Sequence, residues 1–375
     1  MGQLGLRRFQ LAGHRPFPLA GGATGVVGDP GGRSEERNLL DRETLERNLA
    51  GIKPQLERLL DFDRGSNAAT LVDNAAWTAN LPLLDFLRDV GKHVTVNQMI
   101  AKESARSPLD SEHGISFTEF SYMLLQANDF RHLHDEFGVE LQMGGSDQWG
   151  NITAGIDLIR RTSGATAHGI TWPLLLRSDG QKFGKSSGTA VWLSAERTSP
   201  YQFRQYWVQT DDADVAERLL RFSMRSVEEI EAIVAEHASA PERRVAQRAL
   251  ARELTELIHG TEAAEAAEAA ADVLFGGDPV TAPPAALEVV RHEVPTTILR
   301  HDDLGDPVDV LVRTGLASSR SDARRLLEQR SIRANGIQLD GRGDLAEVPL
   351  LHDRDLLLRK GKQTYHMVEI SGPGG

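Results

Sequence analysis

Glycine-rich turns placed directly after short apolar runs limit the folds open to the first half of this chain. Residues 16–20 form such a run, and the segment 21–29 follows it with glycines at positions 22, 25 and 28. A segment with helical character, residues 4–11, precedes the run. Strands, glycine turns and helices in alternation are typical of α/β units that share a parallel sheet. We therefore predict an α/β fold for this part.

The alternation continues to about residue 150. We expect residues 70–74 to begin a further unit, followed by a helix over 83–90 and a strand over 93–97. A helix over 117–128 and a strand over 140–143 extend the pattern. The loop after that last strand should then lie at the carboxyl edge of the sheet.

Charged amphipathic segments replace the glycine turns beyond about residue 199. The segments 212–222, 227–237 and 241–259 have the 3.6-residue periodicity of helices, and the Ala/Glu-rich segment 261–273 is predicted as a solvated helix. Glycines and prolines predict a linker over 276–304. The last residues, 305–375, are expected to form a compact module of helices, short strands and turns.

The composition excludes several classes of protein. The chain has no cysteine, which removes disulfides, thiolate metal sites and cysteine nucleophiles. No segment approaches the ~18 apolar residues of a membrane span, so we expect a cytoplasmic protein without membrane contact. His132 and His134 lack further ligands at a metal-site spacing, so no metal site is predicted.

The net charge of −12 argues against a surface that binds nucleic acid everywhere. Residues 305–375 nevertheless hold 11 basic and 10 acidic residues, which leaves room for a local basic surface. Five arginines there lie on or just after one predicted helix and could engage phosphates by paired hydrogen bonds: Arg320, Arg324, Arg325, Arg330 and Arg333. The alternative is a charged helix face balanced by nearby acids.

Three polar residues share one face of the predicted helix that begins at residue 117. Tyr122, Gln126 and Asp129 follow the spacing i, i+4, i+7. An aromatic hydroxyl, an amide and a carboxylate among apolar neighbours could hold a small zwitterion with a polar tail. The alternative is a solvated polar stripe.

Two loops carry groups suited to nucleotide chemistry. The loop 142–151 follows an apolar strand, and a carboxylate such as Asp147, next to Gln148, commonly accepts hydrogen bonds from ribose at such a sheet edge. Lys182 and Lys185 could follow the charge that builds up on a leaving pyrophosphate. A structural turn and a solvated basic loop are the respective alternatives.

The glycine-rich segment 21–29 is open to two interpretations as well. Its glycines could let a ligand approach the backbone, and Asp29 could bind a cationic group. A purely structural turn between strand and helix explains the glycines equally well.

Five blocks, taken together and in this order, resemble the bacterial type of tyrosyl-tRNA synthetase, a family of class I aminoacyl-tRNA ligases. The blocks are Gly-Gly-Ala-Thr-Gly-x-x-Gly-Asp-Pro, Val-Asn-Gln-Met, Ile-Ser-Phe-Thr-Glu-Phe-Ser-Tyr, Gly-Gly-Ser-Asp-Gln-Trp-Gly-Asn-Ile and Lys-Phe-Gly-Lys-Ser. The resemblance covers nearly the whole chain. It implies a Rossmann-like catalytic domain over 1–198, a helical anticodon-recognising domain over 199–275 and an RNA-binding domain like ribosomal protein S-four over 305–375.

The resemblance also implies a reaction and its partners. Tyrosine attacks the α-phosphate of ATP, with Mg²⁺ expected and no tightly bound cofactor, and the tyrosyl group then passes to the 3′ end of tRNA(Tyr). Members are homodimers, and residues around 86–100 and 115–121 resemble the interface stretch.

Site roles follow from matching positions. Tyr122, Gln126 and Asp29 would hold the ammonium group of tyrosine, Asp129 would accept from its phenol hydroxyl, and Gln148 would lie near its carboxylate. Lys182 and Lys185 would clamp the pyrophosphate. The positions implied to contact ATP or the adenylate are Gln142, Gly144, Asp147, Lys185 and Ser186.

One part of the family pattern is absent. The family begins with a strand and a His-x-Gly-His turn ahead of a helix that ends in Leu-Arg-Arg-Phe, and here that tetrapeptide is residues 6–9. Neighbouring strands lie ~4.8 Å apart, so loss of a central strand would leave two unpaired edges facing a gap. We expect a start upstream of Met1. The alternatives are a non-catalytic RNA-binding paralogue, a tyrosine sensor, or a rearranged sheet that closes the gap.

Overall fold

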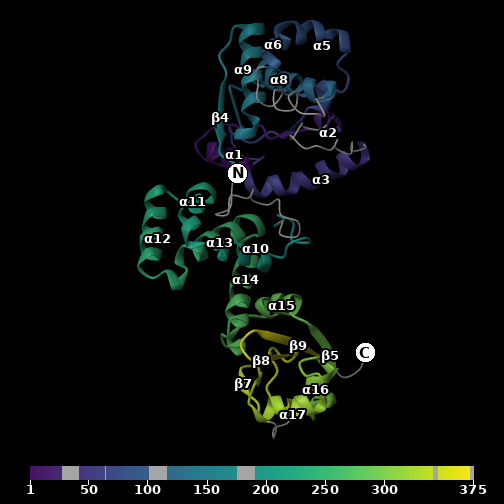
Figure 1. Cartoon of the computed structure of the whole chain (residues 1–375), viewed down its shortest axis with the longest axis vertical. Helices are drawn as coiled ribbons and strands as arrows, with labels where there is room; N and C mark the ends of the chain where they lie inside the picture. Colours follow the sequence, from purple (N-terminus) through teal and green to yellow (C-terminus); the bar gives the residue numbers. More distant parts are fainter. Residues whose placement is uncertain (28–41, 64, 101–115, 175–190, 341–344, 372–375) are drawn as a thin grey trace. The chain divides into compact units, whose positions relative to one another are not determined.

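The computed structural model describes residues 1–27, 42–63, 65–100, 116–174, 191–340 and 345–371 (Figure 1). The chain divides into two compact units, Met1–Ala190 and Val191–Gly375, each with its own fold. No helix among the described residues is long and apolar enough to cross a membrane.

The first unit is mixed α/β, as the sequence predicts. Its elements in chain order are α1 (Gly2–Leu11), β1 (Leu19–Ala20), α2 (Thr24–Val27), α3 (Arg42–Leu59), β2 (Val72–Asp73), α4 (Ala75–Thr78), α5 (Leu83–Asp89), η1 (Gly91–His93), α6 (Val96–Ile100), α8 (Phe117–Phe137), β3 (Leu141–Gly145), η2 (Ser146–Gln148), α9 (Trp149–Ser163) and β4 (His168–Trp172).

The strands of this unit form two separate parallel pairs. β1 pairs with β2 from Leu19 opposite Val72, and β3 pairs with β4 from Leu141 opposite His168. Among the described residues no strand joins the two pairs. A cavity of about 710 Å³ is lined both by residues 16–19 and by residues 139–143, with Phe130 among its apolar walls. The cavity borders both pairs, and among the described residues the alternative of a rearranged sheet that joins them is not found.

The predicted strand over 93–97 is wrong. These residues instead end η1 and begin α6. The Thr95 backbone N–H donates to Gln98 Oε1 and the Gln98 backbone N–H donates to Thr95 Oγ1, both at 3.3 Å. This reciprocal pair is a capping box, which starts a helix despite the β-branched residues around it.

Helices α8 and α9 pack closely in the core of the first unit, and α5 and α6 complete it (Figure 1). The shared apolar cluster consists of Val90, Met99, Met123, Leu124, Ala127, Ala154 and Leu158. Gly155 of α9 lies against Phe130 of α8, where a Cβ would come within 2.8 Å of the ring. The close approach of these helices therefore depends on a residue without a side chain.

The second unit begins with helices. They are α10 (Pro200–Val208), α11 (Asp212–Phe222), α12 (Val227–Ser239), η3 (Pro241–Arg243), α13 (Val245–His259) and α14 (Thr261–Leu274). The predicted helical segments are confirmed, but α14 is not solvated. Its alanines pack against neighbouring helices, and Ala267, Ala270 and Ala271 are almost fully buried. Small side chains let helices approach one another closely. The Ala-rich composition of residues 261–273 is therefore as typical of a packed helix as of a solvated one.

A five-stranded sheet follows in the order β5-β9-β8-β6-β7. The elements after α14, in chain order, are η4 (Pro279–Thr281), α15 (Pro284–Glu293), β5 (Thr296–Arg300), η5 (His301–Leu304), α16 (Pro307–Arg313), α17 (Arg320–Glu328), β6 (Ile332–Ala334), β7 (Ile337–Gln338), η6 (Leu345–Glu347), β8 (Asp355–Lys360) and β9 (Thr364–Ser371).

The predicted linker over 276–304 is also wrong. Like α14, this segment is packed against its neighbours. It contains α15 and the edge strand β5, which pairs in parallel with β9. Leu287 of α15 belongs to one buried cluster with Ala270 of α14 and Met367 of β9. The prolines start helical turns at first-turn positions here instead of marking a flexible connection.

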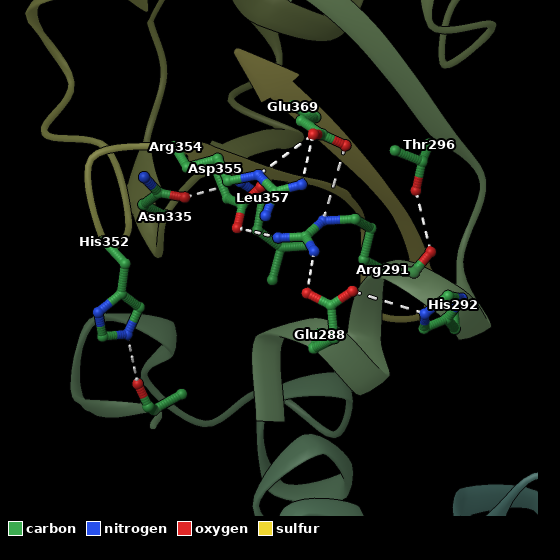
Figure 2. A network of polar contacts seen from close by, with 11 residues as sticks. Glu288, Arg291, His292, Thr296, Asn335, His352, Arg354, Asp355, Leu357 and Glu369 are labelled. Carbon is green, nitrogen blue, oxygen red and sulfur yellow. Dashed lines mark hydrogen bonds and ion pairs between the residues drawn. The ribbon is translucent and has the colours of Figure 1, made fainter. Parts of the chain in front are cut away.

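An ionic network fastens α15 to the sheet (Figure 2). Arg291 Nη2 lies 2.5 Å from Oδ2 of the buried Asp355, and the same guanidinium contacts Glu288. Glu369 lies 3.9 Å from Arg291 Nε and also pairs with Arg354 at 2.5 Å. A buried charge requires such partners, so the network fixes the position of α15 against β8 and β9.

The close contact between α8 and α9 gives a first prediction. Gly155→Ala should destabilise the first unit by about 1–3 kcal/mol, because the added methyl group overlaps Phe130. Urea unfolding followed by circular dichroism measures the change.

The matched control is Gly51→Ala in exposed helix α3, where a Cβ meets nothing within 4 Å. It should leave stability unchanged or raise it by up to ~1 kcal/mol. Equal effects of the two substitutions would contradict the packing described here.

Candidate functional site

A buried carboxylate on α8 is the centre of the candidate site. Asp129 is 1% exposed. Asn74 Nδ2 donates to its Oδ2 at 2.9 Å, and Trp77 Nε1 donates to its Oδ1 at 2.8 Å. Burial raises the pKa of Asp129 to about 6, although the hydrogen bonds from Asn74 and Trp77 act in the opposite direction. Asp129 is therefore ionised at neutral pH and can accept a further hydrogen bond.

Asn74 connects this carboxylate to the turn after β1. Its Nδ2 also donates to Thr24 Oγ1 at 2.9 Å, and its Oδ1 accepts from the Ala23 backbone N–H at 2.8 Å. It directly follows β2, whose parallel partner is β1, so both segments reach the same carboxyl edge. Asn74 is fully buried, and its three hydrogen bonds hold it in one orientation.

Part of the glycine-rich segment has a structural role. A Cβ on Gly22 would lie 2.3 Å from Asp73 Oδ1, which accepts from the Gly22 backbone N–H at 3.0 Å. Only glycine permits this approach. Gly25 lies within α2, whereas Asp29 falls outside the described residues.

A second polar group joins α8 to the start of α9. Gln126 Nε2 donates to Gln148 Oε1 at 3.2 Å, and Asn151 Nδ2 donates to Gln126 Oε1 at 2.9 Å. Gln148 Nε2 in turn donates to Asp147 Oδ2 at 3.3 Å. A Cβ on Gly144 would come within 3.0 Å of Gln148 Cβ, so this glycine sets the distance between β3 and η2.

Tyr122 and Asp129 are buried and Gln126 is half-buried, so the alternative of a solvated stripe is wrong. Tyr122 is 9% exposed and lies one helical turn before Gln126. Segments from two different places in the sequence contact this face: Asn74 after β2 and Gln148 in η2. The structure thus brings together Gln126, Asp147 and Gln148 in one group and surrounds Asp129 with a second.

Of the remaining residues predicted to bind tyrosine or ATP, only Gln142 is described, and it lies apart from these two groups. Gln142 on β3 lines the large cavity, and its Oε1 is buried without a hydrogen-bond partner among the described residues. Lys182, Lys185 and Ser186 fall outside the described residues, as does Asp29. Sequence reasoning missed Asn74, Trp77 and Asn151. The available signals were that Asn74 ends the segment 70–74 and that Asn151 belongs to the fourth of the five blocks.

The five arginines of the last module differ in their surroundings. Arg320 pairs with Asp306 at 2.7 Å and with Asp309 at 3.2 Å, and Arg325 pairs with Asp322 at 2.6 Å. For these two, neighbouring acids balance the charge, as the alternative interpretation expected.

The other three arginines form no ion pair with any described residue within 4.0 Å. Arg324 and Arg330 are exposed, and Arg333 Nη1 donates to the Gly336 carbonyl at 2.9 Å.

The described residues contain no group of three or more His, Asp or Glu side chains that could hold a metal ion.

Two family models match the chain. Residues 3–276 match class I tRNA synthetases of the tryptophan and tyrosine type, and residues 286–368 match the C-terminal domain of the tyrosine-tRNA ligase type. The chain therefore belongs to the class I tRNA synthetase family.

Its relatives belong to the tyrosine branch. A tyrosine-tRNA ligase of Roseiflexus castenholzii is 50% identical over 98% of this chain and 88% of its own length. One of Geobacillus stearothermophilus is 47% identical with the same coverage. The solved mitochondrial tyrosyl-tRNA synthetase of Aspergillus nidulans is 32% identical, with a TM-score of 0.64, and covers 72% of this chain and 80% of its own.

The raised pKa of Asp129 predicts a pH dependence of stability. Between about pH 4 and pH 6 the folded protein keeps a proton on Asp129 that the unfolded chain has lost. The free energy of unfolding should therefore fall by about 3 kcal/mol as pH rises through this window, and stay level above it.

The comparison uses the Asp129→Asn variant, which has no proton to lose. The unfolding free energy of the wild type minus that of the variant, measured in urea, should fall by about 3 kcal/mol as pH rises from 4 to 7. A difference independent of pH would show that Asp129 has an ordinary pKa.

Proposed function

We propose that this chain is a tyrosine-tRNA ligase that activates L-tyrosine with ATP and transfers it to tRNA(Tyr). The observation that carries the proposal is the buried Asp129, held by Asn74 and Trp77 on a helix face that also presents Tyr122 and Gln126. An ionised carboxylate keeps acceptor capacity beyond its hydrogen bonds from Asn74 and Trp77, and a phenol hydroxyl would supply a further donor.

The proposed roles are those that the family resemblance implies. Asp129 accepts from the phenol of tyrosine, Tyr122 and Gln126 bind the ammonium group together with Asp29, and Gln148 lies near the carboxylate. A substrate without the hydroxyl leaves the remaining acceptor site of Asp129 without a donor, so phenylalanine is rejected by ~10⁴ to 10⁵.

The chemistry has two steps. A tyrosine carboxylate oxygen bonds to the α-phosphorus of ATP, and the bond from that phosphorus to the bridging oxygen breaks, which releases pyrophosphate. A ribose hydroxyl at the 3′ end of tRNA then attacks the tyrosyl carbonyl, and AMP leaves. Lys182, Lys185 and Ser186 are proposed to stabilise the pyrophosphate, and Gln142, Gly144 and Asp147 to contact the adenylate.

Mg²⁺ is proposed to arrive on the ATP phosphates as part of the substrate, and the protein to act in the cytoplasm. The domain limits stay predictions. They assign catalysis to residues 1–198, anticodon recognition to 199–275 and RNA binding to 305–375, where Arg320, Arg324, Arg325, Arg330 and Arg333 are the proposed contacts.

The separation of the two strand pairs favours a second candidate, a non-catalytic tRNA-binding paralogue. Tyrosine-dependent exchange of pyrophosphate into ATP distinguishes the two. The protein should catalyse the exchange, and Asp129→Ala should lose most of its preference for tyrosine over phenylalanine, by about 10³-fold or more.

The control for this prediction is Asp135→Asn. Asp135 is a partly exposed carboxylate on the same helix, paired with Arg131 at 3.5 Å. The variant should exchange like wild type. Binding of tRNA without any exchange would support the second candidate and refute the first.

We further propose that the protein is a homodimer through α5, α6 and the start of α8. These helices share one core yet expose large apolar side chains: Leu83, Leu84, Leu87, Val96, Ile100 and Phe117. A monomer rarely leaves so much apolar surface in water.

Leu84→Glu should therefore give a monomer, because Leu84 is 77% exposed and a buried carboxylate at an interface is costly. Size-exclusion chromatography with light scattering measures the mass. Leu11→Glu, at a position 67% exposed on α1, is the control and should stay dimeric. A monomeric wild type would contradict the proposal.

A further inference from the structure

A second cavity lies within the C-terminal unit, where the turn after α14 meets the hairpin between β6 and β7. Its volume of about 410 Å³ is in the range of small-ligand pockets. It is lined by residues 276–280 and 335–337, together with Val273, Arg333, Leu357, Arg359 and Tyr365. It therefore combines segments from the helical part and from the sheet.

Two arginines give this pocket a positive charge. Arg359 Nη1 lies 3.4 Å from the Tyr365 hydroxyl, and its Nε is buried without a hydrogen-bond partner among the described residues. Arg333 uses Nη1 for the Gly336 carbonyl. Asp278 is the one acid among the described lining residues, and its Oδ1 accepts from the Val280 backbone N–H at 3.0 Å. A guanidinium has five N–H donors, and among the described residues the side chains of Arg333 and Arg359 each donate one hydrogen bond, to the Gly336 carbonyl and the Tyr365 hydroxyl.

Apolar side chains lie next to these charges. Val280 is 62% exposed and Ile337 is 51% exposed, and both line the pocket. Gly276 and Gly336 have φ values of +103° and +83°, so each turn passes the pocket without a side chain. An anionic group and a flat apolar group can therefore be bound side by side, with close access to the backbone.

We propose that this pocket binds one unstacked nucleotide of tRNA, with its phosphate between Arg333 and Arg359 and its base against Val280 and Ile337. This inference rests on the proposed function, which supplies the RNA. Guanidinium groups bind phosphate by paired hydrogen bonds, and bases splayed out of single-stranded RNA pack on apolar side chains. A concave pocket of this size admits a single nucleotide and not the side of a duplex.

The test measures binding of a tRNA(Tyr) transcript to the full chain at several salt concentrations. Arg333→Gln should weaken binding about tenfold and reduce the slope of log K against log salt by about one. Ile337→Ser should weaken binding without changing the slope, because it removes contact with the base and no charge.

The matched control is Arg300→Gln, which removes the same charge at the opposite edge of the sheet, where Arg300 is exposed on β5. It should bind tRNA as wild type does. If Arg333→Gln and Arg300→Gln behave alike while both melt at the wild-type temperature, the pocket does not bind RNA.

Cross-linking locates the contact directly. A transcript that carries 4-thiouridine should cross-link to residues 276–280 or 333–337, and cross-links confined to other segments would overturn the proposal. The proposal would also be overturned if an acidic peptide, and not tRNA, slowed hydrogen exchange in the residues that line this pocket. That result would indicate a protein partner.

Pyrophosphate exchange does not involve tRNA, so the two proposals fail separately. Normal exchange with no effect of Arg333→Gln refutes the pocket alone. Binding that depends on Arg333 in a protein without exchange refutes the catalytic proposal alone.

Discussion

Burial of one carboxylate determines how the first unit is built around α8. Asp129 is almost completely buried, and a buried ionised carboxylate is destabilising unless hydrogen-bond donors surround it. Asn74 and Trp77 supply them, and both come from the segment that follows β2. Asn74 in turn fixes the turn after β1 through Thr24 and Ala23. The charge on one helix thus positions two strand ends.

The polar face of α8 and its surroundings were accessible from the sequence to different degrees. The spacing of Tyr122, Gln126 and Asp129 is enough to place them on one face, because helical periodicity is local. Asn74 and Trp77 could not be assigned to Asp129 in this way, since they lie about 50 residues away and their contact depends on how β2 pairs with β1. Local sequence patterns therefore identify residues that share a helix face more readily than they identify the distant residues that hydrogen-bond to them.

The errors in the predicted elements have physical causes of the same kind. The segment 93–97 has the β-branched residues of a strand, but a capping box at Thr95 and Gln98 outweighs that preference. The segment 276–304 has the glycines and prolines of a linker, yet Leu287 and Val290 give α15 an apolar face that the sheet covers. Arg320 and Arg325 are balanced by acids, two of which lie more than ten residues away along the chain.

The ionic network around Arg291 has a mechanical consequence. Because Arg291 holds Asp355 while the alanines of α14 share a core with β8 and β9, the helical part and the sheet are joined by side chains as well as by the backbone. A macromolecule that displaces the sheet when it binds would therefore displace α14 and α15 together with it.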